Sequence, residues 1–167
     1  GLVVGSVAAL AYAESLKAVF LDLCVVPVAQ VSLPLFSERL VRGETDLAWE
    51  QLQGALAALW FLVVPVVVLL WVLSGPLVQM FYQRGAFTAQ STALTASALA
   101  FFSLGLLGES AHYLVSRYFL SLKDTRTLTS LGVPLTVLYV VLLFLLSRVL
   151  SLEGIALGHS LVMIAHM

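Results

Sequence analysis

Charged side chains are scarce in this sequence. Only 8 of its 167 residues are lysine or arginine and 9 are aspartate or glutamate, whereas 61% are apolar. A water-soluble globule of this length needs far more polar surface, so a soluble domain is excluded. The formal net charge of −1 also excludes a polybasic nucleic-acid-binding protein. Much of the surface must instead lie in lipid.

Cysteine is nearly absent as well. Cys24 is the only one, which rules out an internal disulfide, and its apolar neighbours predict that it packs among the helices or against lipid. The sequence also lacks histidine-rich metal spacing and a nucleophile motif with a spaced base. We therefore expect no metal, no cofactor and no enzymatic activity.

What the sequence does contain is long uncharged runs. Residues 55–83, 85–108 and 127–147 carry no charged side chain. Each run exceeds the roughly 18 to 20 residues that a helix needs to cross a bilayer. Segments 2–35 and 154–167 are also apolar, although the first is interrupted by charges and the second is short. The pattern predicts about five membrane spans.

These spans are expected to be helices. Lipid offers no partner to a free backbone N–H or C=O, so only helices or a closed barrel can cross it. The runs are too long and too uniformly apolar for barrel strands. We predict an all-α, polytopic transmembrane bundle with helices at about 5–37, 46–73, 88–122, 125–147 and 154–167. Thr88 should cap the third helix, and Pro27 and Pro34 should kink the first.

The cations gather in two alternate loops. Arg39 and Arg42 follow the first expected helix, and Lys123 and Arg126 follow the third. Alternate loops of a membrane-spanning bundle lie on the same side. The positive-inside rule then places both basic loops in the cytoplasm.

The first expected helix carries charges inside a span. Such a group costs about 2.5 to 3.5 kcal/mol on insertion scales, so it normally faces a partner, a cavity or water. Glu14 and Lys17 are three residues apart and can pair across one turn, and Asp22 is roughly aligned with Ser15. Two interpretations stay open. Glu14 and Lys17 form a neutralised structural pair or reach an aqueous end, or the four residues line a water-filled cavity for a polar head group or a coupling ion.

Glu109 and His112 form a second three-residue pair, in the middle of the third expected helix. The same alternatives apply to this second polar site: a structural pair, or groups that face a polar pathway. Gly105 and Gly108 lie beside it, and small residues at such positions let helices approach closely.

Four short motifs of the sequence match segments of one known family. Residues 5–14 are similar to its G-S-V-x-x-L-x-Y-A-D segment, and residues 28–37 to its V-A-x-x-x-L-P-x-L-S. Residues 84–88 equal its R-G-A-F-T, and residues 124–127 equal its D-T-R-T. The chain thus resembles the MurJ/MviN flippases of the multidrug/oligosaccharidyl-lipid/polysaccharide exporter superfamily. By this resemblance the chain is a C-terminal-half fragment, spanning helices eight to twelve of fourteen.

The resemblance implies a two-lobe transporter of the bacterial cytoplasmic membrane. It would move lipid II, the polyprenyl-linked peptidoglycan precursor, outward by alternating access through a cationic cavity. The expected partners are this lipid-linked glycan, the bilayer and the missing N-terminal half of the same chain, with no nucleic acid.

The sequence departs from the family at cavity positions. Ser15 stands where the family usually has a cavity-facing arginine, with Lys17 two residues later. Tyr113 stands where a lysine is common, and Leu128 where a proline follows D-T-R-T. Since cations hold a pyrophosphate best, Lys17 can replace the arginine only if a local twist turns it inward.

Three functions are therefore weighed. The first is a lipid II flippase with Glu14, Ser15, Lys17 and Asp22 lining the cavity. The second is a related exporter of another polyprenyl-linked glycan or of a cationic solute. The third is a membrane scaffold that no longer transports, having lost its cavity arginine.

Overall fold

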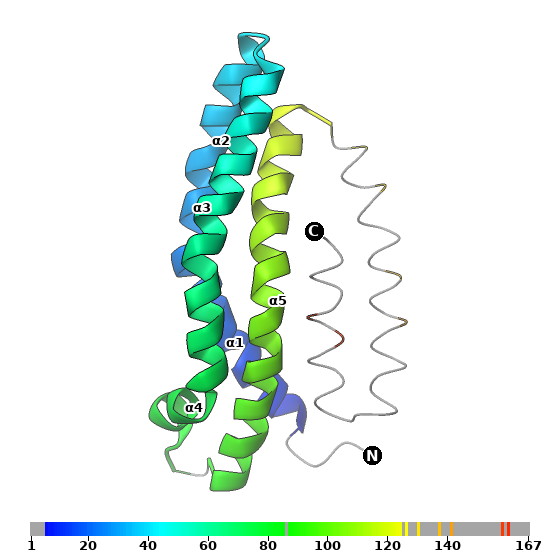
Figure 1. The fold of residues 1–167 in the computed structure, drawn as a ribbon. Coiled ribbons are helices and arrows are strands. Elements are labelled where there is room, and N and C mark those ends of the chain that lie inside the picture. Colours follow the sequence, from blue (N-terminus) through cyan, green and yellow to red (C-terminus); the bar gives the residue numbers. More distant parts are fainter. Residues whose placement is uncertain are drawn as a thin grey trace.

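The computed structural model describes residues 6–85 and 87–124, together with the single positions 126, 130, 137, 141, 158 and 160. Within 6–85 and 87–124 all regular structure is helical, which confirms the all-α prediction. The helices expected at 125–147 and 154–167 fall outside the continuously described residues. Figure 1 shows α2, α3 and α5 side by side, with α1 at an angle below α2.

The first predicted helix is two helices in the structure. Helix α1 spans Ser6–Cys24 and α2 spans Val26–Val41, with a bend of 40° between them. Pro27 lies in the first turn of α2, where a missing N–H does no harm, and Pro34 lies inside α2. Backbone hydrogen bonds from Val25 to Leu21 and from Ala29 to Val25 bridge the bend. A kink at Pro27 was expected, but a break that divides the helix was not.

Helix α2 also runs four residues past the predicted end at 37. Arg42 donates to Glu38 at 2.6 Å, an i,i+4 pair that supports the last turn. The helix ends in a Schellman motif. Gly43 N–H donates to the Leu40 carbonyl, and Glu44 N–H donates to the Arg39 carbonyl. Gly43 takes the left-handed conformation, φ +75°, that this C-terminal motif needs.

Helix α3 spans Thr45–Val72, and the short α4 spans Ser74–Tyr82. Helix α4 lies at the lower end of the bundle in Figure 1 and is turned out of line with α3. The outward side of α3 carries large exposed apolar side chains, among them Phe61 at 84% exposure and Val68 at 56%. Such a face belongs in lipid rather than in water.

Helix α5, Ala89–Ser121, is the centre of the bundle and contacts each of α1 to α4. It begins at Thr88, whose hydroxyl accepts the Ser91 N–H at 3.2 Å, so the predicted N-cap is confirmed. It also ends in a Schellman motif, but here the residue in the left-handed conformation is Lys123, with φ 56°.

Two apolar clusters hold α5 in place. One joins α2, α3 and α5 around buried residues such as Phe36, Leu59 and Leu114. The other joins α1, α4 and α5 around Leu16, Val78 and Leu99. In each cluster the apolar side chains pack closely, and the summed dispersion attraction holds the helices together.

Gly105 marks a close helix approach, as expected from the small residues of this segment. A Cβ added there would lie 3.1 Å from the Ser160 Cα, and the Ser160 hydroxyl donates to the Phe101 carbonyl at 2.5 Å. Among the described residues, α3 and α5 are each long and apolar enough to cross a membrane, and the bent α1–α2 pair is a third such span if its two helices count as one. Helices α3 and α5 contain the uncharged runs 55–83 and 85–108 in large part, whereas the run 127–147 lies outside the continuously described residues.

Candidate functional site

Three charged residues, two from α1 and one from α5, meet inside the bundle. The Lys17 ammonium lies 3.0 Å from Glu14 Oε1 and 2.5 Å from Glu109 Oε1, so one cation sits between two carboxylates. The Lys17 side chain is 1% exposed, that of Glu109 11%, and that of Glu14 45%. The Phe102 ring centre lies 5.5 Å from the same ammonium. We call Glu14, Lys17 and Glu109 the lysine cluster.

The pairing of Glu14 with Lys17 across one turn is confirmed. Glu109, which belongs to the second polar site, also pairs with Lys17 across 92 positions of sequence. His112, one turn further along α5, lies 3.4 Å from the Ser116 hydroxyl through its Nε2. The two polar sites expected to be separate therefore join at Glu109, because α1 crosses α5 at this depth.

Ser15 and Asp22 lie on a different side of α1. Both are exposed within the described chain, and the Ser15 hydroxyl donates to the Ala11 carbonyl at 2.8 Å. Positions 15 and 22 are seven residues apart and share one face of a helix, whereas position 17 is about 200° away from position 15. Helix α1 is regular from Ser6 to Cys24, so no twist brings Lys17 to the Ser15 face.

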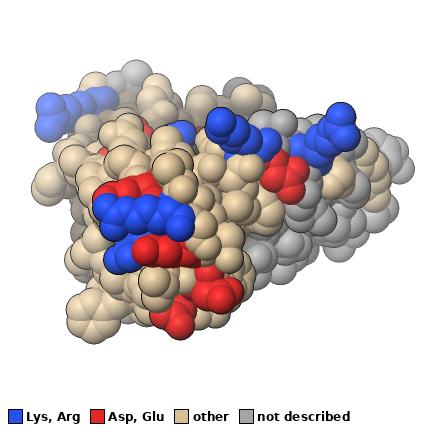
Figure 2. Space-filling view, turned by 90° about the horizontal axis from the view of Figure 1, so that it is seen from above, with Lys and Arg blue, Asp and Glu red and all other residues tan. Residues whose placement is uncertain are grey.

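The cationic loops lie together at one end of the molecule. The α2–α3 turn and the end of α5 are both at the top in Figure 1, and Figure 2, which looks onto that end, shows lysine and arginine side chains beside acidic ones. Arg39 donates to Glu44 at 2.7 Å. Lys123 and Arg126 are exposed.

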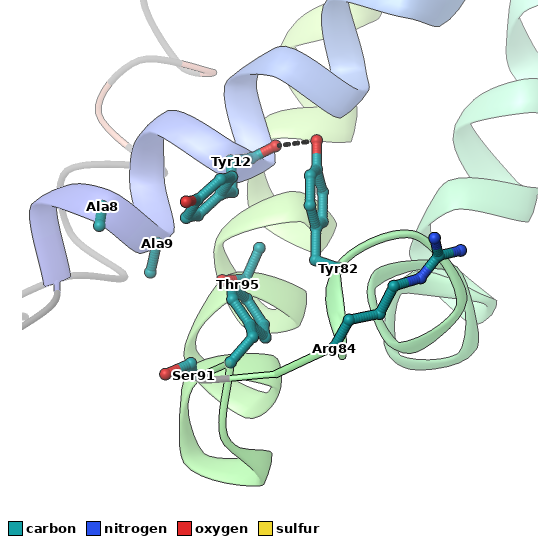
Figure 3. Close-up of a pocket in the computed structure, with 8 residues that line it drawn as sticks. Ala8, Ala9, Tyr12, Tyr82, Arg84, Ser91 and Thr95 are labelled. Atoms are coloured by element: carbon teal, nitrogen blue, oxygen red, sulfur yellow. Dashed lines mark hydrogen bonds between the residues drawn. The ribbon is translucent and has the colours of Figure 1, made fainter.

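A cavity of about 410 Å³ lies at the opposite end, between the first turns of α1 and α5. Its aromatic wall is Tyr12, Tyr82 and Phe87, whose ring centres are 4.9 to 6.0 Å apart. The Tyr82 hydroxyl donates to the Tyr12 carbonyl at 3.4 Å, and burial raises the pKa of that phenol. Figure 3 shows Tyr12 and Thr95 on the two facing helices.

Sequence reasoning did not single out this cavity. The sequence nevertheless marks its lining residues, because Tyr12 belongs to the first matching motif and Arg84 and Phe87 belong to the R-G-A-F-T motif. Tyr12 of the first motif and Phe87 of the R-G-A-F-T motif, 75 positions apart in sequence, thus form part of one wall. Within the described residues, no group of three or more histidine, cysteine, aspartate or glutamate side chains is placed to hold a metal ion, and Cys24 is a half-buried free thiol.

Comparison with known proteins matches almost the whole chain to one family. The family described as "Lipid II flippase MurJ" matches residues 2–167. A probable lipid II flippase MurJ of Rhizobium tropici is 33% identical over 159 residues, which cover 93% of this chain and 29% of that protein. The lipid II flippase MurJ of Thermosipho africanus is 36% identical over 76 residues, 46% of this chain and 16% of that protein.

The fold agrees with that match. The solved structure "Lipid II flippase MurJ, inward closed conformation" superposes with a TM-score of 0.87 at 28% identity, covering 96% of this chain and 34% of that one. The chain therefore spans about a third of the length of the relatives it matches. With the helices, the spans and the motifs in agreement, this chain belongs to the MurJ family of lipid II flippases.

Proposed function

We propose that the complete protein containing this chain moves lipid II, the lipid-linked peptidoglycan precursor, across the bacterial cytoplasmic membrane by alternating access. The observation that carries the proposal is the family match over residues 2–167, supported by the likeness in fold. Because the chain spans about a third of its relatives, we expect the rest of the protein to supply the other lobe. MurJ flippases are transporters rather than enzymes, in keeping with the expectation from the sequence.

In this proposal the two sides of α1 have different tasks. The side with Ser15 and Asp22 faces the other lobe and the pathway for the polar head group, because both side chains are exposed in this chain and the Asp22 carboxylate is costly to expose to lipid. The lysine cluster on the other side holds α1 against α5. Lys17 is then a positioning residue that makes α1 move with the bundle, and Glu14, half-exposed, lies at the edge of the pathway.

In this proposal the basic loops indicate which end of the bundle faces the cytoplasm. Arg39, Arg42, Lys123 and Arg126 lie in the loops at one end, which the positive-inside rule assigns to the cytoplasm. The cavity with Tyr12 and Phe87 then opens on the outer side. A precursor made in the cytoplasm would enter near the basic end and leave near the aromatic end.

A second candidate follows from the charge of α1 itself. Lys17 is the one cation in the α1 sequence and it is buried, whereas Asp22 is exposed on the face proposed to line the pathway. That face favours a cationic solute over an anionic pyrophosphate, since opposite charges attract across a cavity. The two candidates predict opposite effects of adding charge to this face.

Ser15→Arg and Ser15→Glu test this in the complete protein. Both side chains are flexible, polar and larger than serine but differ in the sign of their charge, so the comparison of the two variants isolates the effect of charge. In cells depleted of their own flippase, the flippase proposal expects Ser15→Arg to translocate precursor at least as well as the parent and Ser15→Glu to lose most of the activity. The reverse order would support the cationic cargo. Equal activity of both variants at equal abundance would contradict any contact between this face and a charged substrate.

A further inference from the structure

The cavity at the outer end contains a buried polar group that the fold does not use. Thr95 is completely buried, and no hydrogen-bond partner for its hydroxyl lies among the described residues. A buried hydroxyl without a partner destabilises a protein, so its presence needs a reason. Gln51 Oε1 and Trp60 Nε1 are in the same situation on α3, but Thr95 lines the cavity.

The rest of the lining defines what fits there. Tyr12, Tyr82 and Phe87 offer ring faces and edges, and Ser91 adds a second hydroxyl on α5, one turn before Thr95. Hydroxyl groups both donate and accept hydrogen bonds, whereas aromatic rings pack against C–H surfaces. Arg84 is the one cationic residue among the described lining residues, and Figure 3 shows its guanidinium turned away from Thr95.

A neutral sugar ring matches this lining. A pyranose has an apolar C–H face for the aromatic wall and a rim of hydroxyl or amide groups for Ser91 and for Thr95, whose covered hydroxyl a sugar reaches when the lining side chains shift aside. The volume of about 410 Å³ falls within the usual range for small-molecule sites and has room for such a ring. An anion would have its charge desolvated without a matching cation, which is unfavourable.

We propose that this cavity is a subsite for a neutral pyranose ring of the lipid-linked glycan head group on the outer side of the membrane. The assignment to the head group rests on the proposed flippase function and on the orientation set by the basic loops. The cavity joins α1 to the turn between α4 and α5, so a sugar seated there contacts three helices at once. It would hold the translocated head group while the inner end of the pathway closes.

The decisive variant is Thr95→Val, which replaces the hydroxyl by a methyl group of nearly the same size. Because the hydroxyl has no partner in the fold, the variant is expected to unfold at the same temperature as the parent or higher. A loss of ligand binding then cannot come from unfolding. Thr92→Val is the matched control: Thr92 lies one turn earlier on α5, and its hydroxyl is hydrogen-bonded to the Thr88 carbonyl outside the cavity lining.

The binding experiment uses the complete purified protein and N,N′-diacetylchitobiose, a soluble disaccharide of two N-acetylglucosamine rings, measured by saturation-transfer NMR or calorimetry. The parent and Thr92→Val should bind it saturably and equally. Thr95→Val should bind about two- to tenfold more weakly, the effect of one neutral hydrogen bond, and Tyr12→Ala more weakly still. No saturable binding to the parent, equal binding by Thr95→Val, or a lower unfolding temperature for Thr95→Val would each overturn the subsite.

Measuring precursor flipping by the same variants distinguishes a failure of the sugar subsite from a failure of the flippase proposal. If the parent flips the precursor but chitobiose does not bind, the subsite is wrong and the flippase function stands. If chitobiose binds through Thr95 and the parent flips nothing, the flippase function is wrong. Thr95→Val should slow flipping. Weakened sugar binding with unchanged flipping would overturn the assignment to the head group and leave a site for a free sugar.

Discussion

We expect substitutions in the lysine cluster to lower the free energy of unfolding, because this cluster holds α1 on α5. Lys17→Met keeps the length of the side chain and removes its charge, so the buried Glu109 carboxylate loses the ammonium that lies 2.5 Å away. Breaking a buried ion pair from one side costs about 3 to 5 kcal/mol, because the remaining charge stays desolvated. Lys17→Met should therefore be strongly destabilising.

The other variants of the cluster should follow a fixed order. Glu109→Gln leaves the Lys17 ammonium with Glu14 at 3.0 Å, so its cost should be smaller, about 1 to 3 kcal/mol. Glu14 is 45% exposed, and Glu14→Gln should change stability by less than about 1 kcal/mol. In the double variant Lys17→Met with Glu109→Gln no carboxylate is left buried without its cation, so stability should partly recover relative to Lys17→Met alone.

The assay is thermal unfolding of the complete protein in detergent or nanodiscs, followed by tryptophan fluorescence. The four variants and the parent are compared at one pH and one lipid composition. A loss of stability in the double variant equal to the sum of the losses in Lys17→Met and Glu109→Gln would refute the coupling between α1 and α5. An unfolding temperature of Lys17→Met equal to that of the parent would refute the burial of the ammonium.

Three further predictions follow from the helix ends and contacts. Lys123→Gly should stabilise the protein by about 1 kcal/mol, measured by thermal unfolding, because Lys123 holds a left-handed conformation that glycine adopts freely; a destabilised variant would contradict the φ of 56°. Gly105→Val should cost about 1 to 3 kcal/mol by crowding its neighbour across the helix contact, whereas Gly54→Ala, with open space around it in an exposed helix, should stabilise by up to about 1 kcal/mol. In a cysteine-free background, Asp46→Cys should resist a membrane-impermeant thiol reagent added to intact cells while Gln90→Cys reacts, and the reverse labelling would overturn the assigned orientation.

The helices were predictable wherever local chemistry decides. The uncharged runs predicted α3 and α5 as spans, and Thr88 was recognisable as an N-cap from its residue type and place. The division of the first helix at Val25 was not predictable in the same way. Pro27 signals a disturbance, but whether the chain kinks or breaks depends on how α1 and α2 each pack on α5.

The site was predictable only in part, for a geometric reason. The Glu14–Lys17 pair follows from spacing along one helix. The partner on the other helix does not, because nothing local relates Lys17 to Glu109 across 92 positions. Successive residues of an α-helix are rotated by about 100°, so Lys17 and Ser15 lie on different faces of α1. This separation could be predicted from the sequence. The outer cavity depends on two motifs meeting in space, which requires the fold.

We propose that the complete protein carries lipid II outward across the cytoplasmic membrane. The test expresses the complete protein in cells depleted of their own flippase and measures how much precursor becomes accessible to an enzyme, added outside the cells, that cleaves lipid-linked precursor. We expect the parent to restore precursor in the outer leaflet and Ser15→Glu, at equal abundance, to fail to do so. Precursor that stays inaccessible while the protein is abundant, folded and in the membrane would contradict this proposal.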